Sequence, residues 1–226
     1  MELLHVLNRG VDGRKLFMND LDRIRFVHNL YEFNDTAPAD PNISYHFKSM
    51  DIVSPYIKER RRERLVDIHG WCLMNEHYHL LLSELVEGGL SLFLRKLNIG
   101  YSKYYNEKYH RSGTLFQSRT KKILIEHESH FLYILHYIHL NPLDYLPGSE
   151  EWRVRDHSDI RTAKEALEYL DTYRWSSYLD YAETKNFPSI LTTSLFKEAL
   201  GDITAATCDY LRDAEYGATL AKLTLE

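Results

Sequence analysis

The chain has 226 residues, 44% of them hydrophobic, and a net charge of −5, which argues for one or two globular domains and against disorder. Cys72 and Cys208 lie far apart without a CxxC spacing, which argues against a disulfide framework or cysteine zinc site and favours a reducing, cytoplasmic location. No signal-peptide pattern is present, and no apolar run nears the roughly 20 residues that span a bilayer, so no membrane partner is expected.

The first elements predicted in chain order are a strand and a helix. Residues 2–10 alternate loosely and end at a glycine, which predicts a strand followed by a turn. Asn19 or Asp20 is the expected N-cap of a helix that runs to about Phe33, because its apolar residues recur at helical spacing.

The middle of the chain predicts a hairpin and a long helix. Residues 64–74 and 77–84 read as two strands joined near Asn75, which would form the middle of a sheet. Two glycines then break the chain, and Ser91 is expected to cap a helix through about Tyr109.

A strand over residues 115–126 and a helix that ends at Asn141-Pro142 complete the order strand, helix, strand, strand, helix, strand, helix. This order predicts an α+β, ferredoxin-like (split β-α-β) core with an antiparallel sheet. We expect residues 1–147 to form this domain and residues 148–226 to form a mostly helical C-terminal extension packed on it. The acidic stretch at about residues 148–170 has no evident role.

The charge is unevenly distributed. Residues 95–122 carry eight basic residues against one acidic residue, and tyrosines are interleaved among them. A second basic cluster lies at residues 58–64. The ordinary interpretation of such a cluster is a solvated helix face. The alternative is a basic groove with aromatic platforms, which is what single-stranded nucleic acid binds.

His77 and His79 stand two residues apart in the second strand of the hairpin. Residues at this spacing project from one face of a strand, while Tyr78 projects from the other. Two neighbouring imidazoles can hold one divalent ion and leave coordination positions open, as a catalytic metal requires. The ordinary interpretation of a histidine in a strand is a core or surface residue, which is commoner than a metal ligand. A zinc-protease HExxH motif is absent.

Tyr133, Tyr137 and Asn141 are spaced by four residues along the border of an apolar stripe on the predicted helix that ends at Asn141-Pro142. Aromatic residues in this position ordinarily pack against the core. The alternative is that Tyr137 carries a nucleophilic hydroxyl while Asn141 supplies an amide oxygen to a metal. Spacing alone leaves Tyr133 open as the nucleophile.

Five segments, "HVLNRG", "LMNEHYHLLLSE", "GTLFQSR", "YIHLNPL" and "WSSY", resemble in this order the REP-associated tyrosine transposases of the single-strand HUH transposase superfamily. The resemblance implies that His77, His79 and Asn141 bind Mg²⁺ or Mn²⁺ on a central strand and the following helix. It also implies that Tyr137 attacks single-stranded DNA, leaving a 5′-phosphotyrosine and a free 3′-hydroxyl.

The expected partner is single-stranded or hairpin DNA of repetitive palindromic sequences, bound by a monomer or a homodimer. The resemblance places "NRG" and "GTLFQSR" near the DNA path, and the basic segment supplies further contacts. The expected DNA-binding residues are Asn8, Arg9, Arg95, Lys96, Lys103, Gly113, Gln117, Arg119, Lys121 and Lys122.

Two features depart from the family pattern. The histidine pair usually follows a proline and flanks a bulky apolar residue, whereas here it follows Glu76 and flanks Tyr78. Glu76 adds a carboxylate near the metal, and the buried hydroxyl of Tyr78 needs a partner. A non-catalytic hairpin-binding protein on the same fold is the alternative function. A metal-dependent phosphohydrolase that uses water is a third, in which Tyr137 would be dispensable.

Overall fold

The computed structural model describes residues 2–38, 62–146 and 160–212. Within these ranges four strands form one antiparallel sheet in the order β2-β3-β1-β4. The strands are β1 (Leu3–Arg9), β2 (Val66–Leu73), β3 (His77–Glu84) and β4 (Lys121–Leu124). The predicted α+β fold is therefore confirmed, with the histidine pair on a central strand. No helix of the described part is long and apolar enough to cross a membrane.

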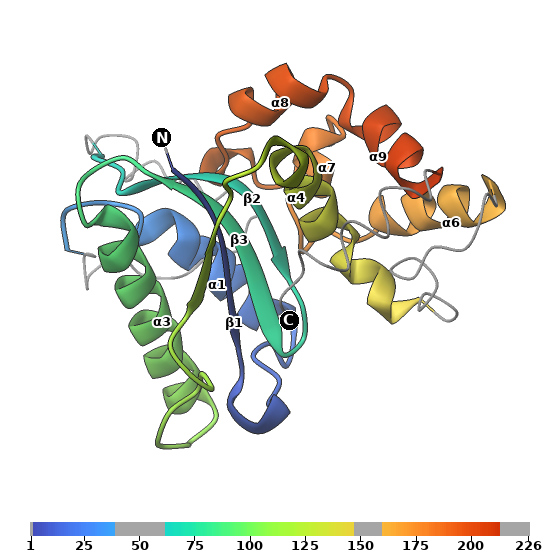
Figure 1. Cartoon of the computed structure of the whole chain (residues 1–226). Helices are drawn as coiled ribbons and strands as arrows, with labels where there is room; N and C mark the ends of the chain where they lie inside the picture. The colour runs from blue at the N-terminus through green and yellow to red at the C-terminus, as the bar shows by residue number, and fades with distance from the viewer. Residues whose placement is uncertain (1, 39–61, 147–159, 213–226) are drawn as a thin grey trace.

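Helices α1 (Asp20–Glu32) and α3 (Gly89–Lys108) cover one face of the sheet (Figure 1). The alternation of β3 explains this packing, because Tyr78, Leu80 and Leu82 all enter the core on this face. Phe26 from α1 and Phe93 from α3, both fully buried, belong to the same core.

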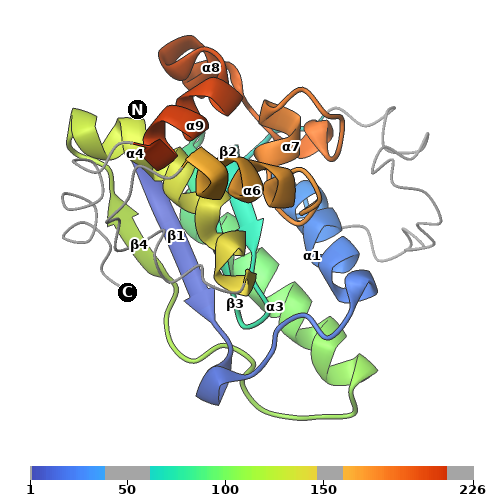
Figure 2. The same cartoon turned by 90° about the vertical axis from the view of Figure 1, so that its right-hand side faces the viewer.

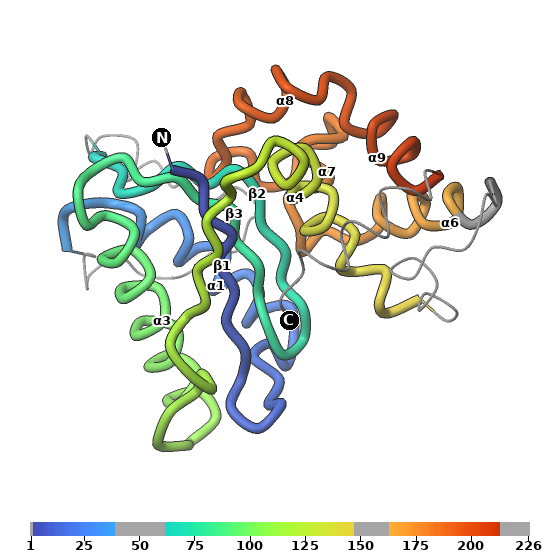
Figure 3. The backbone as a smooth tube through the Cα atoms, in the orientation of Figure 1, coloured from blue at the N-terminus to red at the C-terminus, as the bar shows by residue number. Residues whose placement is uncertain are grey.

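Helix α4 (Glu128–Leu140) covers the opposite face and continues into the 3₁₀-helix η2 (Asn141–Tyr145) (Figure 2). Its predicted apolar stripe is buried there, including Ile134, Leu135 and Ile138. Gly70 of β2 allows the close approach, because a Cβ at this position would lie 2.8 Å from Cδ1 of Leu135. In Figure 3 the chain passes from β4, beside β1, directly into α4.

The C-terminal elements lie on the α4 side of the sheet (Figures 1 and 2). They are α6 (Ile160–Leu170), α7 (Tyr178–Tyr181), η3 (Pro188–Ile190), α8 (Ser194–Leu200) and α9 (Ile203–Arg212). Phe196 of α8 and Tyr210 of α9 share a hydrophobic core with α4. The first half of the acidic stretch noted in the sequence, residues 148–159, lies outside the described residues, and the second half forms α6.

The segment before α7 extends the sheet beyond β2. The amide of Leu73 donates to the carbonyl of Trp175, and the amide of Ser177 donates to the carbonyl of Trp71, both at 2.9 Å. The Ser177 hydroxyl also accepts from the amide of Trp71 at 2.9 Å. The "WSSY" segment is therefore an added partner for the edge of β2.

Two sequence predictions about element ends were wrong. Helix α3 begins at Gly89 rather than at Ser91, because Gly88 adopts a left-handed conformation (φ 73°) and serves as its N-cap. The Glu84 carboxylate accepts from the amide of Leu90 at 3.1 Å and so takes the capping role expected of serine. The strand predicted over residues 115–126 is shorter and comprises only Lys121–Leu124.

Of the two predicted N-caps of α1, Asn19 and Asp20, the structure has Asn19, in a capping box with Asp22. The buried carboxylate of Asp22 also accepts from the end of α3: from Lys108 Nζ at 2.6 Å, the Tyr109 hydroxyl at 2.6 Å and the Tyr104 hydroxyl at 2.9 Å. Burial alone would raise the pKa of Asp22, but these hydrogen bonds outweigh it and hold the pKa below its ordinary value. Asp22 therefore joins the two helices as an ionised group.

Replacing Asp22 with Asn is expected to lower the free energy of unfolding by about 3 kcal/mol at neutral pH, because Lys108 loses its charged partner. The folded pKa lies below the ordinary value of 3.8, so the contribution is complete above that value and is lost as the pH falls through the folded pKa. Urea denaturation of the wild type and of Asp22→Asn across pH should show a constant difference in the free energy of unfolding above about pH 5. This difference should become smaller in acid. A difference that persists unchanged in strong acid would contradict this role.

Candidate active site

In strand β3, His77 and His79 lie on one face of the sheet, and Tyr78, the residue between them in the sequence, lies on the other face. His77 and His79 are buried on the α4 face, with 6% and 0% exposure. Tyr78 faces α1 and α3, and its hydroxyl donates to Oδ1 of Asn98 at 2.8 Å. The partner that the buried Tyr78 hydroxyl requires is thus an asparagine of α3.

The two histidine rings are close enough to share a ligand. Their centroids are 5.0 Å apart and their planes meet at 82°. A metal–nitrogen bond is about 2.0–2.1 Å long, so this separation is compatible with one ion bound by both rings. Oε1 of Glu76 lies 3.7 Å from Nδ1 of His77, which places the additional carboxylate beside the pair as expected.

A third histidine, which the motif does not contain, completes the cluster. His5 of β1 is 4% exposed, and its Nε2 lies 2.9 Å from Nδ1 of His79 in a hydrogen bond. The two rings are stacked, with centroids 5.2 Å apart and planes 13° from parallel. The pairing of β1 with β3 places Leu7 opposite His79, so His5 reaches His79 diagonally on the same face.

Tyr137 is the tyrosine of α4 whose ring contacts this cluster. Its ring centroid lies 5.7 Å from those of His5 and His79, with interplanar angles of 78° and 87°. Tyr133, one turn earlier, packs on Tyr137 at 5.9 Å and on Tyr210 of α9 at 5.5 Å. The geometry therefore favours Tyr137 over Tyr133 as the tyrosine associated with the histidine pair.

Asn141 follows the last residue of α4 and is fully buried. Its Nδ2 donates to the backbone carbonyl of Tyr137 at 2.8 Å. The amide nitrogen is thus used to hold the end of the helix, and Oδ1 is the atom with which Asn141 could bind a cation.

The predicted ligands His77, His79 and Asn141 have side chains of the chemical types that bind a divalent ion. Together they offer two imidazole nitrogens and one amide oxygen, a mixed set suited to Mn²⁺ or, with added water, to Mg²⁺. His, Cys, Asp and Glu side chains of the described residues form no group of three or more that could hold a metal. The amide of Asn141 would therefore have to supply the third protein ligand.

The turn that leads into His77 is anchored by several distant segments. The Asn75 carbonyl accepts from the amide of Leu16 at 2.7 Å, and the Glu76 carbonyl accepts from the amide of Gly10 at 2.7 Å. Nη2 of Arg23 donates to Oδ1 of Asn75 at 2.8 Å. Helix α1 and the loop before it thus position the start of the histidine strand.

His139, within the "YIHLNP" motif, is fully buried, and its Nε2 lies 2.8 Å from the Ser177 hydroxyl. Burial lowers the pKa of His139 well below its ordinary value, so the ring is neutral. This bond ties the tyrosine helix to the "WSSY" segment. Two of the motifs that carry the resemblance are therefore in direct contact.

Asn8 and Lys96, which are among the predicted DNA-binding residues, have partners inside the protein. Asn8 is 4% exposed, and its Nδ2 donates to the Thr120 hydroxyl at 3.0 Å. Nζ of Lys96 donates to the backbone carbonyls of Asp35 and, at 2.7 Å, Ala37. In this structure both side chains hold neighbouring loops.

The remaining basic residues lie on different faces. Arg95 and Lys103 are exposed on α3, on the side of the sheet away from the histidines. In β4, Lys121 pairs with Leu7, which in turn pairs with His79, so Lys121 shares the histidine face. Lys122 turns toward α3, where its Nζ donates to the Ser91 hydroxyl at 3.3 Å. The segment 95–122 is therefore not one continuous basic face.

The segments "NRG" and "GTLFQSR" lie side by side. Gly10 forms an antiparallel bridge with Phe116, and the amide of Gln117 donates to the carbonyl of Arg9 at 2.9 Å. Arg9 pairs with His77 across the strands. Gly113, Gln117 and Arg119 are exposed in this loop. The structure thus brings two predicted DNA-binding segments together beside the histidine strand.

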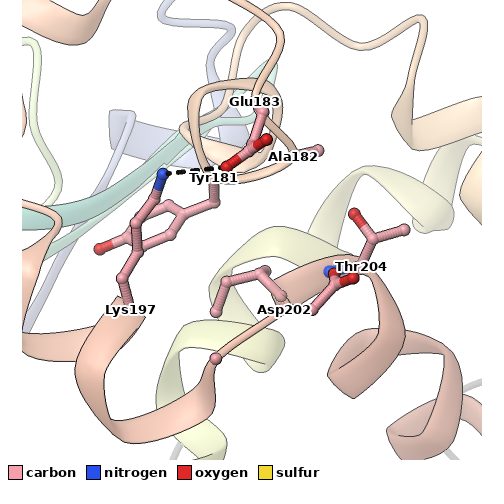
Figure 4. Close-up of a pocket in the computed structure, with 8 residues that line it drawn as sticks. Tyr181, Ala182, Glu183, Lys197, Asp202 and Thr204 are labelled. Carbon is pink, nitrogen blue, oxygen red and sulfur yellow. Dashed lines mark hydrogen bonds and ion pairs between the residues drawn. The ribbon is translucent and has the colours of Figure 1, made fainter.

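A separate pocket of about 440 Å³ opens among the C-terminal helices (Figure 4). Residues of α7, α8, α9 and the turns beside them line it, including Tyr181, Asp202 and Thr204, and Nζ of Lys197 lies 4.0 Å from Oε1 of Glu183 at its rim. None of the residues predicted from the sequence lines this pocket.

Among solved structures, the chain is similar to a REP-associated tyrosine transposase bound to a REP hairpin, with 10% sequence identity, a TM-score of 0.43 and 84% of each chain covered. A likeness of this size identifies neither the family nor the function of the chain. No family model matches the chain, and no curated protein matches its sequence. The case for a function therefore depends on the residues around Tyr137.

Proposed function

We propose that the protein is a metal-dependent transposase or nuclease that cleaves and rejoins single-stranded DNA beside hairpins, as the REP-associated tyrosine transposases do. In this proposal Tyr137 is the nucleophile, and His77, His79 and Asn141 hold Mg²⁺ or Mn²⁺. The observation that carries it is the contact of the Tyr137 ring with the buried histidine cluster. A DNA-binding protein without chemistry would have no need for this combination.

The proposed reaction is an exchange of phosphodiester bonds. The Tyr137 hydroxyl attacks the scissile phosphorus and loses its proton, a bond from Oη to phosphorus forms, and the bond from phosphorus to the 3′-oxygen breaks. The departing 3′-oxygen takes up a proton and leaves as a 3′-hydroxyl. Because the phosphotyrosine keeps the bond energy, attack by a 3′-hydroxyl reverses the step without ATP. When bound, the cation would act as Lewis acid and template for the phosphate.

The protein contributes to the proposed reaction by holding the histidine pair and the tyrosine in fixed positions. His77 and His79 are fixed on the central strand β3, and Tyr137 is fixed on α4, which packs through Leu135 against Gly70 of the neighbouring strand β2. Buried, packed side chains of this kind lose little further freedom when the substrate binds. The arrangement therefore supports chemistry that needs an aligned nucleophile and phosphate.

Lys121, which is exposed on the histidine face of the sheet, should contribute more to DNA binding than Arg95, which lies on the opposite side. We expect Lys121→Gln to weaken hairpin binding about 3- to 10-fold and to lower the slope of log Kd against log salt by about 1. Arg95→Gln removes the same charge from α3 and is expected to change little. Fluorescence anisotropy across salt concentrations measures both, and equal losses would contradict this placement of the DNA.

Covalent trapping tests the function. The full chain is incubated with labelled hairpin oligonucleotides that carry randomised single-stranded flanks, with Mn²⁺, Mg²⁺ or EDTA. The products are resolved on a denaturing gel, and the adduct is mapped by mass spectrometry. We expect an adduct on Tyr137 with either metal and none with EDTA.

Two other outcomes would replace the proposal. Hairpin binding without an adduct or a cleaved strand under any metal would leave a non-catalytic DNA-binding protein. Metal-dependent cleavage without an adduct, retained in Tyr137→Phe, would indicate hydrolysis by water.

A further inference from the structure

We propose that His5 is a positioning residue, which accepts a hydrogen bond from His79 and thereby keeps the proton of that imidazole on Nδ1. The inference rests on the proposed function in one respect, namely that His79 binds the cation. It assigns a role to His5, which lies 74 positions before His79 in the chain.

The atoms in contact determine the chemistry. The hydrogen bond joins Nε2 of His5 to Nδ1 of His79 at 2.9 Å. Between two neutral imidazoles one nitrogen must donate and the other must accept. If Nδ1 of His79 donates, its Nε2 carries the lone pair that a metal requires. If His5 donates instead, the proton of His79 is on Nε2, and that nitrogen cannot coordinate.

The packing fixes the ring as well as the proton. His5 and His79 are stacked 13° from parallel, and both meet the Tyr137 ring nearly edge to face. A rotation of His79 about its side-chain bonds would break the hydrogen bond and both ring contacts together. His5 therefore also sets the direction in which Nε2 of His79 points.

His5 supports the ligand rather than acting as one. The nitrogen of His5 that is nearest to the pair, Nε2, is already bound to His79. His5, His77 and His79, all within the described residues, are not arranged as a three-residue metal site. Metal-binding histidines are commonly held in this way by a hydrogen bond at their second nitrogen, and loss of the partner weakens binding about 10- to 100-fold.

The proton positions can be observed without metal or DNA. Long-range ¹H–¹⁵N correlation spectra of the full chain distinguish protonated from unprotonated ring nitrogens, and His5→Gln and His79→Gln variants assign the signals. We expect His79 to carry its proton on Nδ1 and the Nε2 of His5 to be unprotonated. A His79 protonated on Nε2 would overturn the inference, and the spectrum that decides this is that of the wild-type chain.

Two substitutions separate the hydrogen bond from the packing. His5→Phe keeps an aromatic ring against His79 and Tyr137 but cannot accept, whereas His5→Gln loses the ring and offers an acceptor oxygen. Calorimetric titration with Mn²⁺ alone should show about 10- to 100-fold weaker binding in His5→Phe and nearly normal binding in His5→Gln. The opposite order would show that His5 acts only through packing.

The outcomes distinguish this inference from the proposed function. If wild-type protein forms the Tyr137 adduct but His5→Phe binds Mn²⁺ normally, the inference fails and the function stands. If wild-type protein binds Mn²⁺ in a His5-dependent way but forms no adduct with any hairpin, the inference stands and the proposed chemistry fails.

Discussion

Tyr137→Phe is expected to reduce covalent adduct formation and strand cleavage by at least about 1000-fold, because the change removes the attacking oxygen. The phenylalanine ring would keep the contacts with His5 and His79. The free energy of unfolding should therefore change by no more than about 1 kcal/mol. Hairpin affinity and Mn²⁺ affinity should remain close to those of the wild type. Adduct yield on a denaturing gel, with binding measured in parallel, tests this combination.

Tyr133→Phe is the matched control. It makes the same chemical change one helical turn earlier, in a side chain that packs on Tyr137 and Tyr210. We expect this variant to retain most of its adduct yield. Loss of the adduct in Tyr133→Phe with retention in Tyr137→Phe would reverse the assignment of the nucleophile.

Gly10→Ala is expected to lower the free energy of unfolding by about 3 kcal/mol or more. The backbone of Gly10 is extended (φ −65°, ψ 141°), so its conformation suits any residue, but a Cβ there would lie 2.0 Å from the carbonyl oxygen of Arg14. A backbone atom cannot move aside as a flexible side chain can. Because the Gly10 amide also donates to Glu76, a shift here should displace the start of the histidine strand and weaken Mn²⁺ binding.

Gly13→Ala provides the comparison, since it lies in the same loop. A Cβ at Gly13 meets no atom within 4 Å, but the positive φ of 68° is unfavourable for alanine and should cost about 1 kcal/mol. Urea denaturation of both variants measures the difference. Equal destabilisation would show that the contact with Arg14 relaxes without cost.

The features that could be predicted from the sequence are those set by local periodicity. A strand places every second side chain on one face, so the opposite facing of His77 and Tyr78 follows from their spacing. The start of α1 follows from the polar residues Asn19 and Asp20 before a helical apolar pattern, although the pattern does not decide which of the two is the N-cap. The buried hydroxyl of Tyr78 predicts that a partner exists, but only the packing of α3 on the sheet identifies Asn98.

The features that could not be predicted depend on how distant segments pair. His5 joins the site because β1 pairs with β3 in one register, and a shift of one residue would turn it to the other face. Its place in "HVLNRG" was the available signal, and spacing along the chain could not connect it to His79. The basic segment divides for the same kind of reason, because β4 turns Lys121 and Lys122 to opposite faces.

The pairing of the "WSSY" segment with β2 is also expected to affect how the protein folds during its synthesis. The backbone groups of Trp71 and Leu73 find their partners in residues more than 100 positions later. Until those residues leave the ribosome, this border of the sheet can bind another nascent chain in their place. Slow translation beyond residue 147 should therefore favour aggregation, and a chaperone that shields strand edges should oppose it.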